Sequence, residues 1–392
     1  MTYNFDEFID RKNTDSLKYD FAAHRGKPAD LLPLWVADMD FRTPPCVVDA
    51  LIEKSAHGIF GYSESRNDYF DVLQGWFSRR FNWQIKPEWL LKTPGVVFAI
   101  STAIRALTKQ GDAVLIQQPV YYPFAECIEV NQRKLVVNEL IFDGNGYKID
   151  FEDFERKIQE HGVKLFILCS PHNPVGRVWT EDELIRIGDI CVKHGVTVIS
   201  DEIHADFIYQ GHRHTVFADL KPEYEAITIT CTAPSKTFNL AGLQISNIFI
   251  ANRALRNRIR QELTRCGYSQ LNIMGIVACK AAYSKGEPWL EELKNYLTDN
   301  LNFLRSYLET YLPEIKLVEP QGTYLVWLDC RALKLSDEKL DEHIISRAKL
   351  WLDAGTMFGQ GGSGFQRINI ACPRALLKQA LTQLSDSLTT QA

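Results

Sequence analysis

The sequence lacks any run of about 20 apolar residues, the length that a membrane-spanning helix needs. Its first residues, Met-Thr-Tyr-Asn-Phe-Asp-Glu, include two acids and no apolar core, so they do not resemble a secretory signal peptide. Nine cysteines are present, but none forms a Cys-x-x-Cys pair, which argues against a zinc ribbon or a dithiol redox motif. An odd number of cysteines without a signal peptide is typical of reduced thiols, so we expect a cytoplasmic protein.

An excess of positive charge is also missing. The 44 Lys and Arg residues are outnumbered by 49 Asp and Glu residues, and the net charge of −5 disfavours nucleic acid or an anionic membrane as a partner. Neither a helix-turn-helix pattern nor a basic stretch is present to bind DNA. The His212–His214 segment has too few neighbouring ligands for a metal site. We therefore expect no nucleic-acid, membrane or metal partner.

The composition is that of an ordinary globular protein, with 45% hydrophobic and 24% charged residues. A chain of 392 residues is too long for one compact core and suits two domains. In the middle of the chain, β-rich runs alternate with helical patterns, and the capping box Thr180–Glu183 predicts a helix that ends near Gly195. The runs predicted as buried strands are residues 113–117, 164–169, 196–200, 227–231 and 245–250.

This alternation predicts βαβ units, and therefore a three-layer α/β/α domain with a mostly parallel sheet covered by helices on both faces. Beyond about residue 285 the pattern changes to long helices with one β-rich segment, Thr323–Asp329, which predicts a smaller α+β domain. We expect residues 45–285 to form the large domain, and residues 1–44 and 286–392 to form the small one together. In such sheets, ligands bind beyond the carboxyl ends of the strands.

Lys236 follows one of the predicted strands, within Ala233-Pro-Ser-Lys-Thr-Phe-Asn-Leu-Ala-Gly242. Small and apolar neighbours would desolvate its ammonium group, lower its pKa and favour the neutral amine that attacks an aldehyde. The alternative is an ordinary surface lysine on a turn, and the local sequence does not decide between the two.

Three more polar residues lie near the ends of predicted strands. Asp201 could bond the pyridine nitrogen of pyridoxal 5′-phosphate (PLP) and keep the ring electron-poor, or it could cap the next turn. His204 could reach the 3′-oxygen of that ring or be a core histidine. Asn173, in a loop constrained by two prolines, could donate to the same oxygen or serve only as a turn residue.

Weaker signals are consistent with this chemistry. Gly95-Val-Val97 opens a predicted helix whose free N–H groups would suit a phosphate, although many glycines precede helices. Tyr121 or Tyr122 could stack on a cofactor, or both could be ordinary core aromatics. Arg367 lies in an alternating segment, and its guanidinium fits a substrate α-carboxylate as well as it fits a surface salt bridge.

The order of these motifs is more specific than any one of them. Asn-Pro, Asp-Glu-x-His, Ser-Lys and a late Arg, in this order over essentially the whole chain, resemble the fold-type I PLP enzymes, the aspartate aminotransferase superfamily. Finer motifs are similar to its C–S β-lyase branch, which includes cystalysin and one class of bacterial cystathionine β-lyase. These motifs are Val36-Ala-Asp-Met-Asp-Phe41, Gly61-Tyr-Ser63, Pro119-Val-Tyr-Tyr-Pro123, Ser170-Pro-His-Asn-Pro-Val-Gly-Arg-Val-Trp179, Ser200-Asp-Glu-Ile-His204, Thr232-Ala-Pro-Ser-Lys-Thr-Phe-Asn239 and Gly322-Thr-Tyr324.

The resemblance implies a role for each matching position. Lys236 would hold PLP covalently and act as the base at the substrate Cα, and Arg367 would hold the substrate carboxylate beside Tyr122 and Tyr324. Tyr62 would reach the phosphate of the neighbouring subunit, which implies a homodimer with shared active sites. The other implied cofactor contacts are Asp201 at the pyridine nitrogen, Asn173 at the 3′-oxygen, Tyr121 on the ring, and Gly95, Val96, Val97 and Ser235 at the phosphate.

Three positions depart from the common aminotransferase pattern: His204 replaces a tyrosine, Ala233 a serine or threonine, and Gln244 an arginine. All three departures agree with the lyase branch. The resemblance therefore implies β-elimination of L-cystathionine, L-cysteine or S-substituted cysteines to pyruvate, ammonia and a thiol. An aminotransferase would share every residue named above. Two further alternatives are a PLP-binding regulator that acts through a protein partner and a Rossmann-like binding protein in which Lys236 is incidental.

Overall fold

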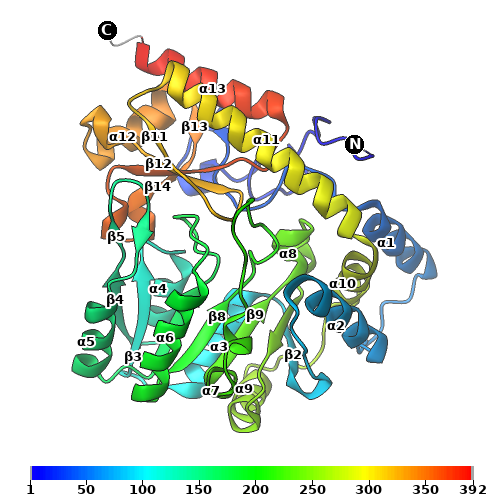
Figure 1. The fold of residues 1–392 in the computed structure, drawn as a ribbon. Coiled ribbons are helices and arrows are strands. Elements are labelled where there is room, and N and C mark those ends of the chain that lie inside the picture. The colour runs from blue at the N-terminus through cyan, green and yellow to red at the C-terminus, as the bar shows by residue number, and fades with distance from the viewer. Residues whose placement is uncertain (1, 390–392) are drawn as a thin grey trace.

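The computed structural model describes residues 2–389, and a seven-stranded sheet lies at the centre of its larger part (Figure 1). The four neighbouring pairs from β9 (Thr228–Thr232) to β4 (Lys134–Glu139) are parallel, whereas β10 (Ser246–Phe249) runs antiparallel to both of its neighbours. The predicted mostly parallel sheet is therefore confirmed. In spatial order the strands are β2 (Leu90–Thr93), β10 (Ser246–Phe249), β9 (Thr228–Thr232), β8 (Thr197–Asp201), β7 (Leu165–Cys169), β3 (Ala113–Gln118) and β4 (Lys134–Glu139).

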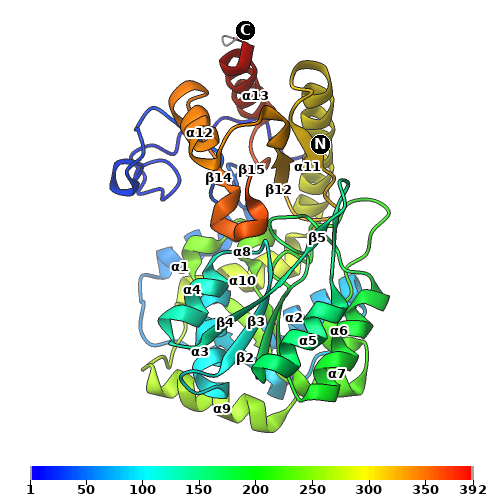
Figure 2. The same cartoon turned by 90° about the vertical axis from the view of Figure 1, so that its left-hand side faces the viewer.

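Helices cover both faces of this sheet because successive strand residues point to opposite sides. Leu115 and Phe166 pack against helices on one face, and Val114 and Ile167 pack against helices on the other. Figure 2 shows the two helical layers on either side of the strands, as predicted for an α/β/α sandwich. The first layer contains α5 (Phe151–His161), α6 (Glu181–His194) and α7 (Pro222–Ile227), and the second contains α3 (Val96–Leu107), α4 (Pro123–Val130) and α9 (Arg253–Arg265).

A smaller α+β part contains a four-stranded antiparallel sheet, as the change of pattern beyond residue 285 predicts. The N-terminal stretch joins it, because β1 (Leu32–Pro33) pairs with β13 (Leu350–Trp351). The fold class is confirmed, and the domain bounds stay a prediction. The sheet contains β11 (Lys316–Val318), β12 (Leu325–Asp329), β15 (Phe365–Asn369) and β14 (Asp353–Ala354), beside α11 (Glu287–Tyr311), α12 (Asp337–Glu342) and α13 (Arg374–Thr389).

Local signals set the ends of the helices that support the site. Thr180 Oγ1 accepts a hydrogen bond from the Glu183 N–H, and the Glu183 carboxylate accepts one from the Thr180 N–H, so α6 begins at the predicted capping box. It ends at His194, where Gly195 takes a left-handed conformation with φ of 65° that glycine adopts without strain. On the other face, α3 begins at Val96, directly after its N-cap residue Gly95.

The remaining helices, beside β2 and β10 or at the end of the sheet, are α1 (Pro45–His57), α2 (Asn67–Phe81), α8 (Pro234–Thr237) and α10 (Ile273–Lys285). Within residues 2–389, no helix combines the length and the apolar character that crossing a bilayer requires. In the same part of the chain, no group of His, Cys, Asp and Glu side chains is arranged so that it could hold a metal ion.

Candidate active site

A cavity of about 190 Å³ lies at the carboxyl ends of β7 and β8, where ligands of parallel sheets bind. All the cofactor-binding residues predicted from the sequence line it, with the exception of Tyr62. They come from five separate segments of the chain, so the fold brings together residues that the sequence keeps far apart. The lining residues are Ala37, Pro94, Gly95, Val96, Val97, Tyr121, Cys169, Asn173, Asp201, Ile203, His204, Ser235, Lys236 and Ala241.

Lys236 enters the cavity from α8, and its Nζ donates a 2.8 Å hydrogen bond to the backbone oxygen of Ala37. The pKa of Lys236 is lowered to about 8, mainly by burial. The carboxylates of Asp38 and Asp201 raise this pKa, and the guanidinium of Arg367 lowers it further. The net result is an amine of which an appreciable fraction is neutral near pH 7. This is the chemical state that an attack on an aldehyde requires.

Asp201 is the last residue of β8, and its side chain faces the same cavity. Burial raises the pKa of Asp201 to about 7, against the hydrogen bond from the Ile203 N–H, which lowers it. That hydrogen bond, from the Ile203 N–H to Asp201 Oδ1, is 3.1 Å long. A carboxyl group with this pKa can share a proton with a basic ring nitrogen, because the two proton affinities are similar.

His204 directly follows Ile203 in the turn after β8 and lines the same cavity. Burial, together with the positive charges of Lys236 and Arg367, holds the pKa of His204 far below its usual value, so the ring is neutral. Its Nδ1 is buried and has no hydrogen-bond partner among the described residues. A buried polar atom of this kind costs free energy unless a ligand or water satisfies it.

Arg367 lies on β15, and its side chain is almost completely buried. Its Nη1 donates to Asn173 Oδ1 over 3.0 Å, and its Nη2 donates to the Trp35 backbone oxygen over 2.7 Å. The same Nη2 forms an ion pair with Asp353, which stands opposite Arg367 in the β14–β15 register. Burial raises the pKa of Asp353, and the charge of Arg367 opposes that rise. Arg367 is thus held in one position by three different segments.

Of the four predicted tyrosines, three lie at or beside the cavity, and Tyr62 lies outside it. The Tyr121 and Tyr122 rings lie 5.6 Å apart, and the Tyr121 N–H donates to the Asn173 backbone oxygen over 3.0 Å. The Tyr324 hydroxyl donates to the Ala37 oxygen over 3.0 Å, on the same acceptor as Lys236. Tyr62 is not brought to the cavity within one chain, because its side chain is 96% exposed in the segment between α1 and α2.

Sequence reasoning missed several residues of the site. Cys169 and Ile203 form part of the cavity wall and could have been found, since they adjoin the predicted Ser170–Asn173 loop and Asp201. Ala37 stands in a motif that the resemblance singles out, but no signal in the sequence shows that its oxygen meets Lys236. The pairing of Asp353 with Arg367 follows from the β14–β15 register, and nothing in the sequence indicates it.

The lining offers a partly neutral amine, a carboxyl group that can share a proton, an unpartnered imidazole nitrogen and the N-terminus of α3. The amine matches the aldehyde of the predicted PLP, the carboxyl group matches its ring nitrogen, and the imidazole nitrogen matches its ring hydroxyl. The N–H groups at the start of α3 suit its phosphate, because a helix N-terminus carries partial positive charge. The residues present therefore fit this cofactor.

Residues 29–384 match the family model for aminotransferase class I and II. The chain belongs to this family. Among its relatives, the Cystathionine beta-lyase PatB of Bacillus subtilis (strain 168) is 45% identical over 386 residues, which covers 98% of this chain and 100% of the relative. The predicted resemblance to the aspartate aminotransferase superfamily is thus confirmed.

Solved structures of this family agree closely with the fold. Cystalysin from Treponema denticola, which contains a pyridoxal 5′-phosphate cofactor, is 38% identical with a TM-score of 0.97, and the match covers 100% of both chains. A PLP-bound putative aminotransferase from Clostridium difficile 630 is 45% identical with a TM-score of 0.96, covering 98% of this chain and 100% of the other. The family therefore includes relatives named as lyases and relatives named as aminotransferases.

Proposed function

We propose that this protein is a PLP-dependent C–S lyase that performs β-elimination on cysteine-type substrates such as L-cystathionine, L-cysteine or S-substituted cysteines. The observation that carries the proposal is that Lys236 and Asp201, each with a strongly shifted pKa, face one buried cavity. Paired shifts of this kind are typical of catalytic sites. Full-length similarity to a relative named as a cystathionine β-lyase supports the choice of reaction.

PLP would be held by the cavity lining, with Lys236 as its covalent attachment and the start of α3 and Ser235 at its phosphate. Asp201, Asn173 and His204 would bond the polar atoms of its ring, and Tyr121 would pack against the ring face. When bound, PLP supplies an aldehyde for the substrate amine and a ring that stabilises negative charge at the substrate Cα.

The residues of this chain then have separate tasks. Lys236, as a neutral amine, takes the proton from the substrate Cα. Arg367 binds the substrate α-carboxylate and fixes the orientation of the bond that breaks. Asp201 keeps a proton at the base of the cavity, where it offsets the charge that develops during the reaction.

The net reaction consumes one water molecule for each substrate. The Cα–H bond breaks with its proton on Lys236, the C–S bond breaks with both electrons on sulfur, and the sulfur leaves as a thiol after it gains a proton. The remaining three-carbon unit and water give pyruvate and ammonia. No external oxidant or 2-oxo acid enters this balance, which distinguishes it from transamination.

We further propose a homodimer in which Tyr62 completes the site of the neighbouring subunit. The segment between α1 and α2 exposes Ile59 and Phe60 beside Tyr62, an unusual accumulation of apolar surface. A hollow of about 1150 Å³ lies nearby, between α1, α2 and α10, away from Lys236. A second copy of the chain packed on this face would cover both features.

The test uses PLP-loaded protein and L-cystathionine in the absence of any 2-oxo acid. We expect pyruvate and thiol to appear in equal amounts over many turnovers, with Lys236→Ala inactive as the control. Turnover that requires an added 2-oxo acid would instead establish an aminotransferase. Binding of PLP without turnover of any amino acid would favour a regulatory protein.

A further inference from the structure

The segment Trp35–Phe41, here called the strap, runs past the active site without regular secondary structure. Its backbone oxygens accept hydrogen bonds from the two most important side chains of the site. Arg367 Nη2 donates to the Trp35 oxygen over 2.7 Å, and Lys236 Nζ donates to the Ala37 oxygen over 2.8 Å. The position of the strap therefore determines what the amine of Lys236 contacts.

Two buried or half-buried amides attach the strap to the site from both sides. Asn239, three residues after Lys236, accepts a hydrogen bond from the Met39 N–H and donates to the Met39 and Phe41 oxygens. These three hydrogen bonds are 2.9–3.0 Å long. Asn369, two residues after Arg367, donates to the Val36 and Asp38 oxygens over 2.7 Å each. The strap is thus tied to the segments that carry the site's two cations.

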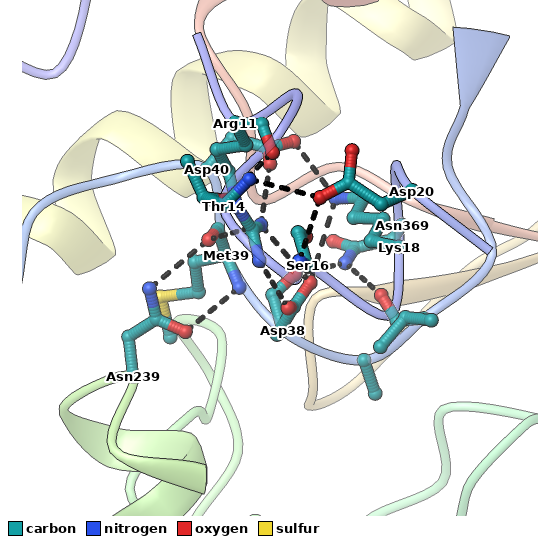
Figure 3. Close-up of polar contacts among 12 residues, drawn as sticks. Arg11, Thr14, Ser16, Lys18, Asp20, Asp38, Met39, Asp40, Asn239 and Asn369 are labelled. Atoms are coloured by element: carbon teal, nitrogen blue, oxygen red, sulfur yellow. Dashed lines mark hydrogen bonds and ion pairs between the residues drawn. The ribbon is translucent and has the colours of Figure 1, made fainter. Parts of the chain in front are cut away.

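The side chains of the strap are fixed by a third connection, an ion-pair cluster with the N-terminal segment (Figure 3). Arg11 binds Asp38 over 2.7 Å and Asp40 over 2.8 Å. Lys18, whose side chain is completely buried, lies 2.7 Å from Asp40 and 3.8 Å from Asp38. Two cations therefore face two carboxylates in a largely desolvated setting, where such pairs fix geometry strongly.

The two carboxylates of this cluster differ in one respect. Asp40 is 4% exposed and is the closer partner of Lys18, so it mainly serves the cluster itself. Asp38 is 19% exposed, directly follows Ala37 and also accepts two N–H groups from Arg11. Asp38 alone thus combines a place in the cluster with a place beside the oxygen that holds Lys236.

We propose that Asp38 is a positioning residue for the amine of Lys236, held in place by Arg11 and Lys18 of the N-terminal segment. It keeps the strap where the Ala37 oxygen meets Lys236 Nζ. The N-terminal segment, whose Arg11 and Lys18 lie more than 200 residues from Lys236 in the chain, thereby influences the protonation of the catalytic group. The inference rests on the proposed function only in treating Lys236 as catalytic.

The charged groups that face Lys236 come from every surrounding element. Asp38 on the strap and Asp201 on β8 raise its pKa, Arg367 on β15 lowers it, and burial lowers it most. His204 is neutral and adds no charge. Loss of the Asp38 carboxylate removes the largest of the influences that raise the pKa, so the pKa of Lys236 must fall and the amine must become more reactive at pH 7.

The experiment measures the pKa of Lys236 in cofactor-free protein from the pH dependence of its acetylation by acetic anhydride, followed by peptide mass spectrometry. Asp38→Asn is expected to lower this pKa by about half a pH unit or more, which makes labelling at pH 7 about threefold faster. Asp40→Asn is the matched control, because it removes the other carboxylate of the same cluster. Asp40→Asn is expected to lower the midpoint of thermal unfolding more than Asp38→Asn does, and to leave the pKa of Lys236 almost unchanged.

A pKa that is equal in Asp38→Asn and the wild type overturns the proposal, and so does an equal fall in both variants. If Asp40→Asn does not fold, Asp20→Asn replaces it, because it removes a carboxylate of the same segment that bonds the N–H groups of Asn13, Thr14 and Ser16 rather than the strap. The labelling needs neither PLP nor a substrate, so its outcome is independent of whether the protein is a lyase.

Discussion

The guanidinium of Arg367 lies 3.0 Å from the side-chain oxygen of Asn173, although 194 residues separate them in the chain. Asn173 stands in the loop after β7 of the large sheet, and Arg367 stands on β15 of the small sheet. The contact therefore joins the two sheets at the point where the substrate carboxylate is expected. It places the proposed substrate anchor and a proposed cofactor ligand in one hydrogen-bonded unit.

Replacement of Arg367 by lysine is predicted to raise the KM for L-cystathionine by at least about tenfold, with a smaller change in kcat. A lysine ammonium cannot reach Asn173, Trp35 and Asp353 together while it also binds a carboxylate through two parallel N–H groups. Steady-state kinetics measure both parameters. Arg331→Lys is the control, because Arg331 forms a similar paired contact with Asp329 on the surface. An unchanged KM in Arg367→Lys would rule out carboxylate binding there.

Replacement of Asp201 by asparagine is predicted to stabilise the cofactor-free protein at pH 8 while lowering kcat by at least about a hundredfold. Burial raises the pKa of Asp201 from an ordinary 3.8 to about 7. Its stabilising contribution is thus complete below pH 3.8 and is lost as the pH rises through about 7, where the buried carboxylate costs roughly 4 kcal/mol. Urea unfolding at pH 5 and pH 8 tests this sign. A variant less stable than wild type at pH 8 would contradict it.

The rate at which cofactor-free protein takes up PLP is predicted to rise with pH and to level off above about pH 8. Only the neutral amine of Lys236 attacks the aldehyde, and burial lowers the pKa of Lys236 from 10.5 to about 8. Below that pH the rate should fall by about tenfold for each unit, since the neutral fraction falls in that proportion. Stopped-flow absorbance gives the profile. A rate that still rises between pH 9 and 10 would mean that the amine is not desolvated in solution.

Much of this site follows from the sequence. Residues 113–117, 164–169 and 196–200 predict β3, β7 and β8 to within one residue at each end, because parallel strands buried on both faces are continuously apolar. The same reasoning places Asp201 and Asn173 at one edge of the sheet. An apolar run carries no direction, however, and the antiparallel course of β10 could not be read from residues 245–250.

Contacts that depend on long-range register could not be predicted. Asp353 meets Arg367 only because β14 pairs with β15 at that residue. The Ala37 oxygen meets Lys236 because Asn239, Asn369 and the ion pairs of Asp38 fix the strap. No local propensity encodes either arrangement, since both are consequences of tertiary packing.

A mixture of two inactive variants is predicted to recover activity if Tyr62 serves the neighbouring subunit. Lys236→Ala and Tyr62→Ala homodimers each lack one component at both sites, whereas a mixed dimer has one site with both defects and one intact site. After unfolding and refolding at equal concentrations, about a quarter of wild-type activity should return. Recovery no greater than the sum of the separate variants would place Tyr62 outside the site.

We expect the amine of Lys236, which shares a buried cavity with Asp201, to capture the aldehyde of PLP. The most direct measurement is reduction of the PLP-loaded protein with sodium borohydride, followed by digestion and mass spectrometry. A single phosphopyridoxyl group is expected, carried by Lys236 in nearly every molecule, with none in Lys236→Ala. A group found on another lysine, or spread over several surface lysines, would contradict it.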